Sequence, residues 1–263
     1  MTARKRRWLK ILSLLLFISA GLFIEMTKLA PKRYKMRMEV VESDKIPKQF
    51  NQVSIAFFSD ILSDFSNLDK AIQSIQESKP DLILFGGNIS KDHLTEDEKN
   101  SLIEKLSEIQ APLGKYNVIA QLDTKYQNHE ILEASGFKTL NSSGNLIYNS
   151  AQGAINIIGI NEPLETSNEL DEHFTIALMN DPDLSLNVNY DLLLAGHNLG
   201  GQFVLPVFGP INQDITLYQK RVDQKDRIQM ITSGLGTLKY DARLLTHPES
   251  VLIILKSSDA NES

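Results

Sequence analysis

Cysteine is absent from the 263 residues of this chain. Its absence excludes disulfides, thiolate-bound zinc and a cysteine nucleophile. It also suits an extracytoplasmic protein whose host does not use disulfides. Internal repeats and low-complexity tracts are absent as well, while 42% of the residues are hydrophobic and 23% are charged. These proportions are typical of a globular protein, and the length suffices for one domain with a large core.

Basic residues are scarce relative to acidic ones beyond residue 37. Residues 1–37 contain ten Lys or Arg and one Glu, which gives this segment a net charge of +9. The whole chain has a formal net charge of −6, so the remainder carries −15. Nucleic-acid phosphates need a basic binding surface. The acidic globular part therefore argues against nucleic acid as a partner.

One long hydrophobic run begins at Trp8 and ends before Glu25, and Lys10 is the only charged residue within it. The run of about 17 residues is at the short end of what crosses a hydrocarbon core of ~30 Å. We predict a transmembrane anchor at residues 8–26, in contact with the lipid bilayer, after a basic tail at residues 1–7. A cleaved signal peptide is the alternative, although Ala30 before Pro31 makes a poor cleavage site.

The charges that flank the anchor are balanced, with five Lys or Arg on each side. Four of the basic residues lie side by side at positions 4–7, within a very short leading tail. Such a cluster holds the N-terminus in the cytoplasm, whereas a long domain is translocated largely regardless of its charge. We therefore expect a single-pass protein of the cell membrane, with its N-terminus inside and its domain extracytoplasmic.

Short apolar runs alternate with helical patterns in residues 51–256, which we assign to one domain. Strands are predicted at 53–58, 81–85, 117–120, 154–160, 175–179, 191–195, 227–232 and 251–255. Two helices are predicted to begin at capping boxes, formed by Ser66 with Asp69 and by Thr95 with Glu98. This order predicts an α/β fold of layers around a mixed sheet. We expect a juxtamembrane linker and the first strand at 27–50, and a polar tail at 257–263.

Polar segments follow several of these strands, at the sheet edge where ligands gather in α/β folds. In chain order they are Ser59-Asp60-Ile61-Leu62, Gly86-Gly87-Asn88, Gln121-Leu122-Asp123, Asn180-Asp181-Pro182 and Gly196-His197-Asn198-Leu199-Gly200-Gly201-Gln202. This ordered set resembles the metal-binding turns of the calcineurin-like metallophosphoesterase family, and the ending from Ser233 to Glu249 resembles its membrane-anchored bacterial branch. The resemblance covers about residues 50–256. It implies a layered α-β-β-α sandwich of mixed sheets, here preceded by one N-terminal transmembrane helix.

The resemblance also implies seven positions for a binuclear metal site, which is the family norm. They fall on Asp60, Leu62, Asn88, Gln121, Asn180, His197 and Leu199. Asp60 and His197 alone keep the expected ligand type, and the family's catalytic His falls on Leu122, before Asp123. Leucine has no lone pair with which to bind a metal or move a proton. We therefore expect no catalytic residue, no metal and no other cofactor.

The replacements predict how the vestigial site is packed. Leu62 and Leu199 would both be His ligands of one metal in the family, so we expect the two leucines to lie side by side and fill the vacated volume. Asn88, Gln121 and Asn180 are expected to surround His197 and to satisfy one another by hydrogen bonds.

Three functions follow from these expectations. The favoured one is a catalytically degenerate, membrane-anchored protein that acts as a scaffold or regulator by binding a protein partner at the cell envelope. The first alternative is a divergent phosphoesterase with one metal held by Asp60, Asn88 and His197. The second alternative is a module that binds an envelope ligand in the old substrate cleft.

Overall fold

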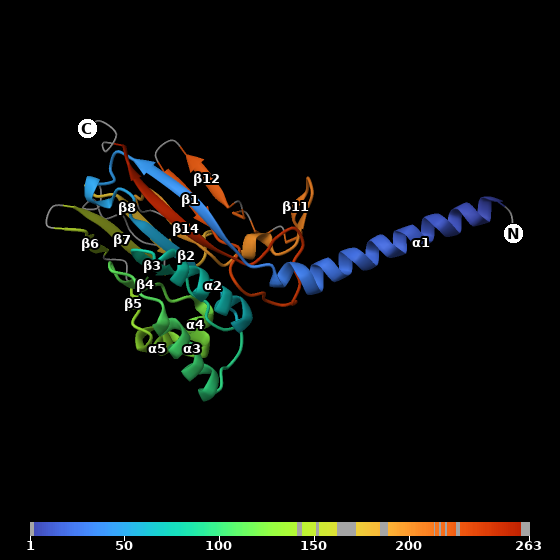
Figure 1. Ribbon diagram of the computed structural model, residues 1–263, viewed down its shortest axis with the longest axis horizontal. Coiled ribbons are helices and arrows are strands. Elements are labelled where there is room, and N and C mark those ends of the chain that lie inside the picture. The colour runs from blue at the N-terminus through green and yellow to red at the C-terminus, as the bar shows by residue number, and fades with distance from the viewer. Residues whose placement is uncertain are drawn as a thin grey trace.

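The computed structural model describes residues 3–140, 144–150, 153–161, 172–184, 189–212, 214–215, 217–218, 220–224 and 227–258. A long N-terminal helix projects from a layered α/β domain (Figure 1). This helix, α1, spans Ala3–Ile24 and is one helix long and apolar enough to cross a membrane. A π-helical segment, Glu25–Leu29, and a 3-10 turn, Ala30–Lys32, continue it into the domain.

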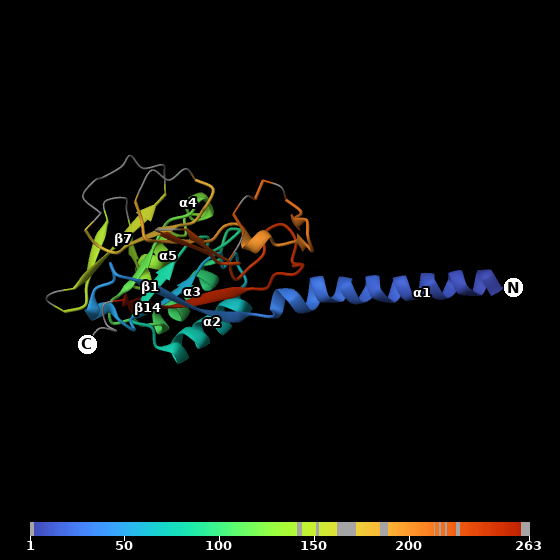
Figure 2. The ribbon, with the colours of Figure 1, turned by 90° about the horizontal axis from the view of Figure 1, so that it is seen from above.

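The domain contains two six-stranded sheets that pack face to face (Figure 2). The first sheet has the order β1-β14-β2-β3-β4-β5. Its strands are β1 (Lys35–Ser43), β2 (Ser54–Phe58), β3 (Leu82–Phe85), β4 (Lys115–Asn117), β5 (Lys138–Thr139) and β14 (Glu249–Ser257). All neighbours in this sheet are parallel except β14 and β2.

The second sheet has the order β12-β13-β9-β8-β7-β6. Its strands are β6 (Asn145–Tyr148), β7 (Ala154–Ile160), β8 (Thr175–Met179), β9 (Leu192–Ala195), β12 (Arg221–Gln224) and β13 (Arg227–Ile231). The four central strands are parallel, and an antiparallel strand pairs with each edge. Strands buried on both faces explain the continuous apolar runs of the sequence.

Helices cover the outer face of the first sheet (Figure 1). They are α2 (Phe65–Ser78), α3 (Glu96–Glu108), α4 (Gln121–Tyr126) and α5 (His129–Ala134). Apolar side chains of α2, α3 and α5 pack against Phe58 and Phe85 on that face. The outer face of the second sheet is packed by Leu184, Tyr190 and Leu217 from connecting segments. The remaining short elements are η3 (Lys48–Phe50), η5 (Leu199–Gly201), β10 (Val204–Leu205) and β11 (Gly209–Pro210).

These layers confirm the predicted α/β fold with mixed sheets, and α1 confirms one long apolar N-terminal helix. The capping box of Thr95 and Glu98 is also confirmed. The cap predicted at Ser66 is wrong: α2 begins after Asp64, whose carboxylate accepts from the backbone N–H of Asn67. The strand predicted at 117–120 ends at Asn117, because Ala120 donates its N–H to Asp123 of α4.

The ends of the domain differ in detail from the expected segments. The segment 27–50 contains the end of the helical run, β1 and η3. Of the segment 257–263, Ser257 is the last residue of β14 and is buried, with its hydroxyl bonded to the carbonyl of Ile46. Residues 259–263 lie outside the described part of the chain.

Candidate functional site

The turns after β2, β3 and β9 meet where the carboxyl ends of the two sheets come together. Five of the residues expected at the site have a left-handed backbone, with φ between 49° and 64°: Asp60, Leu62, Asn88, His197 and Leu199. Asparagine and aspartate tolerate this conformation, whereas for leucine it costs about 1–2 kcal/mol. The turns therefore keep a costly backbone shape at the two positions where the side chain is apolar.

The carboxylate of Asp60 is buried and is the centre of the site. Its Oδ1 accepts from the side-chain amide of Asn88 at 2.8 Å and lies 3.5 Å from that of Asn180. Its Oδ2 accepts from the hydroxyl of Ser59 at 2.6 Å and from the backbone N–H of His197 at 2.8 Å. Both carboxylate oxygens are thus already bonded to protein donors.

The amides of Asn88 and Asn180 extend this network across the two sheets. Asn88 Nδ2 donates to Asn180 Oδ1 at 3.1 Å, and Asn180 Nδ2 donates to the carbonyl of Gly86 at 2.7 Å. Asn88 Oδ1 is buried and accepts no hydrogen bond within the described residues. The network joins the turns after β2, β3, β8 and β9.

Close approach of the backbone is part of the same arrangement. A Cβ atom at Gly196 would overlap both Ser59 Oγ and Asp60 Oδ2. Any side chain at position 196 would therefore displace the Asp60 carboxylate from the N–H of His197. Glycine is required here for space rather than for a special φ.

Asp123, the third member of its sequence segment, also faces the turn after β3. Its buried carboxylate accepts from the backbone N–H groups of Asn88, Ile89 and Ala120 at 2.7, 2.8 and 3.1 Å. Burial raises the pKa of the Asp123 carboxyl; the three N–H donors oppose the shift, and the nearby Asp60 carboxylate adds to it. Asp123 thus shapes the turn that carries Asn88.

Gln121 and Leu122 are not part of the hydrogen-bond network. Gln121 is the first residue of α4 and its side chain is exposed, so it does not join the other amides. Leu122 is partly exposed beside it. The prediction that three amides surround His197 is therefore wrong: the amides of Asn88 and Asn180 contact Asp60 and each other, and Gln121 does not take part.

His197 contributes its backbone rather than its ring to the network. Within the described residues no hydrogen bond of its imidazole is present, and the side chain is partly exposed. The residue lines a pocket of about 380 Å³ with Leu199, Phe203, Ile211 and Tyr240, among others. The imidazole is therefore available to that pocket and not committed to Asp60.

Leu62 and Leu199 are both buried, with exposed fractions of 1% and 2%. Both pack against the loop after β13: a Cβ atom at Gly234 would lie 2.9 Å from Leu199 Cδ2, and one at Gly236 would lie 2.8 Å from Leu62 Cβ. The two leucines thus fill the volume on either side of one loop. Their direct contact with each other stays a prediction.

Arg243 is a residue of the site that sequence reasoning noted only as part of the family-like ending. Its fully buried guanidinium donates to the carbonyls of Leu199, Ser233, Gly234 and Gly236 at 2.6–3.3 Å. Burial lowers the pKa of Arg243 to about 10, while Glu249 and other carboxylates oppose the shift, so it is charged at neutral pH. A planar group with five donors suits this bridge between loops.

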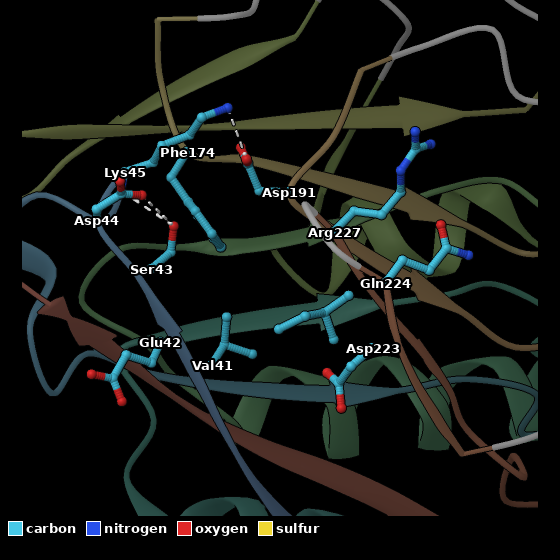
Figure 3. Close-up of a pocket in the computed structure, with 11 residues that line it drawn as sticks. Val41, Glu42, Ser43, Asp44, Lys45, Phe174, Asp191, Asp223, Gln224 and Arg227 are labelled. Carbon is cyan, nitrogen blue, oxygen red and sulfur yellow. Dashed lines mark hydrogen bonds and ion pairs between the residues drawn. The ribbon is translucent and has the colours of Figure 1, made fainter.

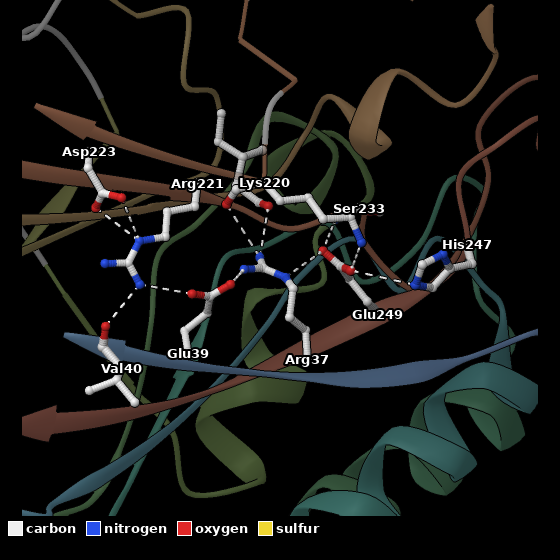
Figure 4. Close-up of polar contacts among 10 residues, drawn as sticks. Arg37, Glu39, Val40, Lys220, Arg221, Asp223, Ser233, His247 and Glu249 are labelled. Atoms are coloured by element: carbon white, nitrogen blue, oxygen red, sulfur yellow. Dashed lines mark hydrogen bonds and ion pairs between the residues drawn. The ribbon is translucent and has the colours of Figure 1, made fainter. Parts of the chain in front are cut away.

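A second buried charge, Glu249, lies at the start of β14 and was also missed as a site residue (Figure 4). Its carboxylate pairs with Lys220 and lies 3.5 Å from Arg37 Nε and 3.8 Å from His247 Nε2. Burial, and then repulsion by Lys220, lowers the pKa of His247 to about 4. Although His247 and Glu249 are close, the imidazole is neutral at pH 7, and Lys220 and Arg37 neutralise the carboxylate.

A pocket of about 520 Å³ beside the second sheet lies away from this site (Figure 3). It is lined by the end of β1 and by the β12–β13 hairpin, and Lys45 pairs with Asp191 across it at 3.0 Å. None of its lining residues belongs to the turns around Asp60. It is therefore separate from the site around Asp60.

The residues present do not fit the binuclear metal site that the resemblance implies. A pair of divalent ions needs anionic bridging and imidazole ligands. Asp60 is bonded to protein donors through both oxygens, Asn88 replaces the bridging carboxylate, and Leu62 and Leu199 offer no lone pair. Across the described ranges, no group of three or more His, Asp or Glu is placed to hold a metal ion.

The chain is similar to two proteins of Bacillus subtilis. It is 30% identical over 264 aligned positions to the uncharacterized metallophosphoesterase YkuE, and the match covers 88% of each chain. It is 28% identical over 222 positions to the uncharacterized protein YpbG, covering 77% of this chain and 81% of that one. No family model matches the chain.

Solved structures show weaker likeness. The Thermus thermophilus protein TT1561 is 13% identical with a TM-score of 0.46, covering 70% of this chain and 91% of that one. A structure described as a novel archaeal phosphodiesterase is 11% identical with a TM-score of 0.39, covering 71% and 87%. At these scores neither structure adds to the argument about the site.

Proposed function

The chain belongs to the metallophosphoesterase family, and from this premise we propose that it is a catalytically degenerate member that acts by binding at the cell membrane. The observation that carries the proposal is the state of Asp60. Its carboxylate accepts hydrogen bonds from Ser59, Asn88 and the backbone of His197, where an active site would direct it to a metal. A carboxylate saturated by protein donors is a structural group, since a cation would have to displace those donors.

The preserved turns support a role for the surface of the degenerate site. Leu62 and Leu199 keep left-handed φ angles, although neither side chain gains a polar contact by it. Arg243 holds the carbonyl of Leu199 and those of the Gly234–Gly236 loop together. Strain that persists in this way points to a function of the turn shape. We assign that function to recognition of a protein partner at the cell envelope.

The anchoring part of the proposal rests on α1. Its apolar part from Trp8 to Ile24 extends for about 25 Å at 1.5 Å per residue, at the short end of what crosses a hydrocarbon core of ~30 Å. The basic residues at 4–7 favour a cytoplasmic N-terminus, which would place the domain outside the cytoplasm.

Hydrolysis of a phosphodiester model substrate tests the loss of activity. The full chain in detergent micelles, supplied with Mn²⁺, is compared with Asp60→Ala and with micelles alone. We expect the three rates to be the same, because the described residues contain no group of three or more His, Asp or Glu placed to hold a metal ion. A rate well above that of empty micelles, and abolished in Asp60→Ala, would refute the proposal and favour a divergent phosphoesterase.

A further inference from the structure

The segment that contains β10 and β11 lies at the end of the domain from which α1 leaves (Figures 1 and 2). Large apolar side chains of this segment and of residues 238–245 are exposed. The set, called here the apolar rim, consists of Leu205, Val207, Phe208, Ile211, Leu238, Tyr240 and Leu245. Within the described domain, the other large exposed hydrophobics lie on two edge strands, β1 and β6. Scattered exposed hydrophobics are ordinary, whereas a cluster at one end marks an interaction surface.

Backbone hydrogen bonds hold the segments of the apolar rim together. Val204 of β10 donates to the carbonyl of Leu244, and Leu244 donates to the carbonyl of Gln202. Ile211, just after β11, donates to the carbonyl of Phe203. The side-chain amide of Gln202 donates to the carbonyl of Tyr240 at 2.9 Å. The apolar rim is therefore one connected surface of the domain.

The same segments are fastened to the end of the long helix. Arg243 donates its backbone N–H to the carbonyl of Met26 at 2.9 Å, two residues after α1 ends at Ile24. Asn67, buried at the start of α2, donates to the carbonyl of Pro31 at 2.8 Å. No free linker therefore separates the apolar helix from the domain. A membrane that contains α1 would lie directly against the apolar rim.

The β10–β11 hairpin carries the most exposed members of the apolar rim. Val207 is fully exposed and Phe208 is 84% exposed. Val207 also has a φ of 72° directly after Pro206, in a turn position that glycine or asparagine usually occupies. A β-branched residue with positive φ is a backbone outlier. A valine that is both strained and solvated is explained if its side chain enters an apolar phase.

We propose that the apolar rim docks on the outer surface of the bilayer that holds α1, with Val207 and Phe208 inserted at the level of the headgroups. The inference rests on the proposed anchoring and adds a second contact with the same membrane. Lys28, Lys32 and Lys239 are exposed at the same end of the molecule. Basic side chains beside an apolar surface match the anionic headgroups of a membrane surface.

Membrane docking fixes the tilt of the domain and the direction from which a partner can approach. The pocket beside His197 shares Ile211, Leu238 and Tyr240 with the apolar rim, so it would open at the bilayer surface. The pocket between α2 and Thr237, lined by Thr27 and Lys32, would lie at the same level. A protein that recognises the degenerate site must then reach it along the membrane plane.

Quenching by lipids tests the docking on the full chain. Because the sequence has no cysteine, Val207→Cys creates a single thiol for an environment-sensitive fluorophore. The labelled chain is reconstituted in vesicles of neutral and anionic phospholipids that carry a nitroxide near the top of the acyl chains. If residue 207 is inserted by ~5–10 Å, the nitroxide should quench about half or more of the emission of the fluorophore attached there. The same label at Tyr148→Cys, on exposed β6 at the other end of the domain, should keep its emission.

Each outcome decides the proposal. If the nitroxide lipids quench the label at 207 no more than the label at 148, docking is overturned. Disulfide-linked dimers of Val207→Cys in the absence of quenching would also overturn it, because the apolar rim would then contact a second copy of the chain. A carbonate wash of the vesicles tests the anchor separately. Protein that stays in the membrane after the wash but shows no quenching at 207 would refute docking while leaving the anchor intact.

Discussion

Leu62 and Leu199 combine burial with a left-handed backbone, so substitutions there test how the site is packed. Changing Leu62 to His should lower the free energy of unfolding by ~1–3 kcal/mol, because the imidazole would be buried without a ready partner. Leu62→Met, which keeps the volume and the apolar character, should cost less than ~1.5 kcal/mol. Denaturant unfolding of the full chain in micelles measures both changes. If Leu62→His were as stable as Leu62→Met, the buried position would still accommodate an imidazole, contrary to this prediction.

His247 predicts a pH dependence of stability. Its pKa is about 4 in the folded chain and 6.5 in the unfolded reference. Above pH 6.5 the imidazole is neutral in both states. As the pH falls from 6.5 towards 4, the unfolded chain alone takes up the proton, so folding becomes less favourable, by at most ~3 kcal/mol.

The comparison with His247→Gln isolates this contribution from that of the carboxylates. Unfolding of both chains is measured at several pH values between 7 and 4. The loss of stability on acidification should be smaller in His247→Gln, since glutamine does not titrate. Parallel curves for the two chains would mean that His247 is protonated in the folded state too.

At the level of single residues, the sequence predicted the members of the site better than their arrangement. Asp60, Asn88 and Asn180 do come together, because each follows a strand whose carboxyl end reaches the same edge. Gln121 does not, because it begins a helix, and the first residue of a helix can direct its side chain to solvent. Arg243 could not be placed, because its role depends on how the loop 233–236 folds back and on the carbonyl of Leu199, which is far away in the sequence.

Among the elements, the start of α2 shows what sequence patterns resolve and what they miss. Ser66 and Asp69 have the spacing of a capping box, yet the residue that caps α2 is Asp64. Capping depends on which residue has a non-helical backbone with its side chain turned to the first free N–H groups. Periodicity fixes the presence of a helix but leaves its first residue uncertain by a few positions.

A pair of substitutions distinguishes the two possible caps. Asp64→Ala should lower the free energy of unfolding by about 1 kcal/mol, because the N–H of Asn67 loses its acceptor. Ser66→Ala should change it by less than ~0.5 kcal/mol, since Ser66 is an exposed residue of the first turn. Unfolding of both variants under one set of conditions is the measurement. The reverse order of the two effects would restore the cap predicted at Ser66.

The strands were predicted more closely than the helix starts. The runs at 154–160 and 175–179 coincide with β7 and β8, since strands buried on both faces are nearly continuous apolar runs, here interrupted only by the buried Asn156 and Thr175. The strand predicted at 117–120 lies too late in the sequence, since β4 spans Lys115–Asn117. Ala120 instead precedes α4 and donates its backbone N–H to the carboxylate of Asp123. Apolar character alone does not show where sheet pairing stops.

For the whole molecule, the separation of charge along the chain determines the expected topology. Residues 1–37 around α1 carry a net charge of +9, and the rest of the chain carries −15. We predict that a cysteine introduced at Ser258, next to the end of β14, reacts with a membrane-impermeant maleimide on intact, wall-stripped cells. It would be the sole thiol of the chain, so labelling is unambiguous. Labelling only after lysis would reverse the orientation and place the domain in the cytoplasm.

We infer that this member of a family built on metal chemistry has a site held together by hydrogen bonds around Asp60. The metal content of the full chain tests it most directly. The protein is purified without chelators from cells grown with Mn, Fe and Zn, and its metals are measured beside those of Asp60→Ala. We predict far less than one ion per chain, with no difference between the two, because the Asp60 carboxylate is already satisfied by Ser59, Asn88 and His197. A content near one or two ions per chain that disappears in Asp60→Ala would contradict the account.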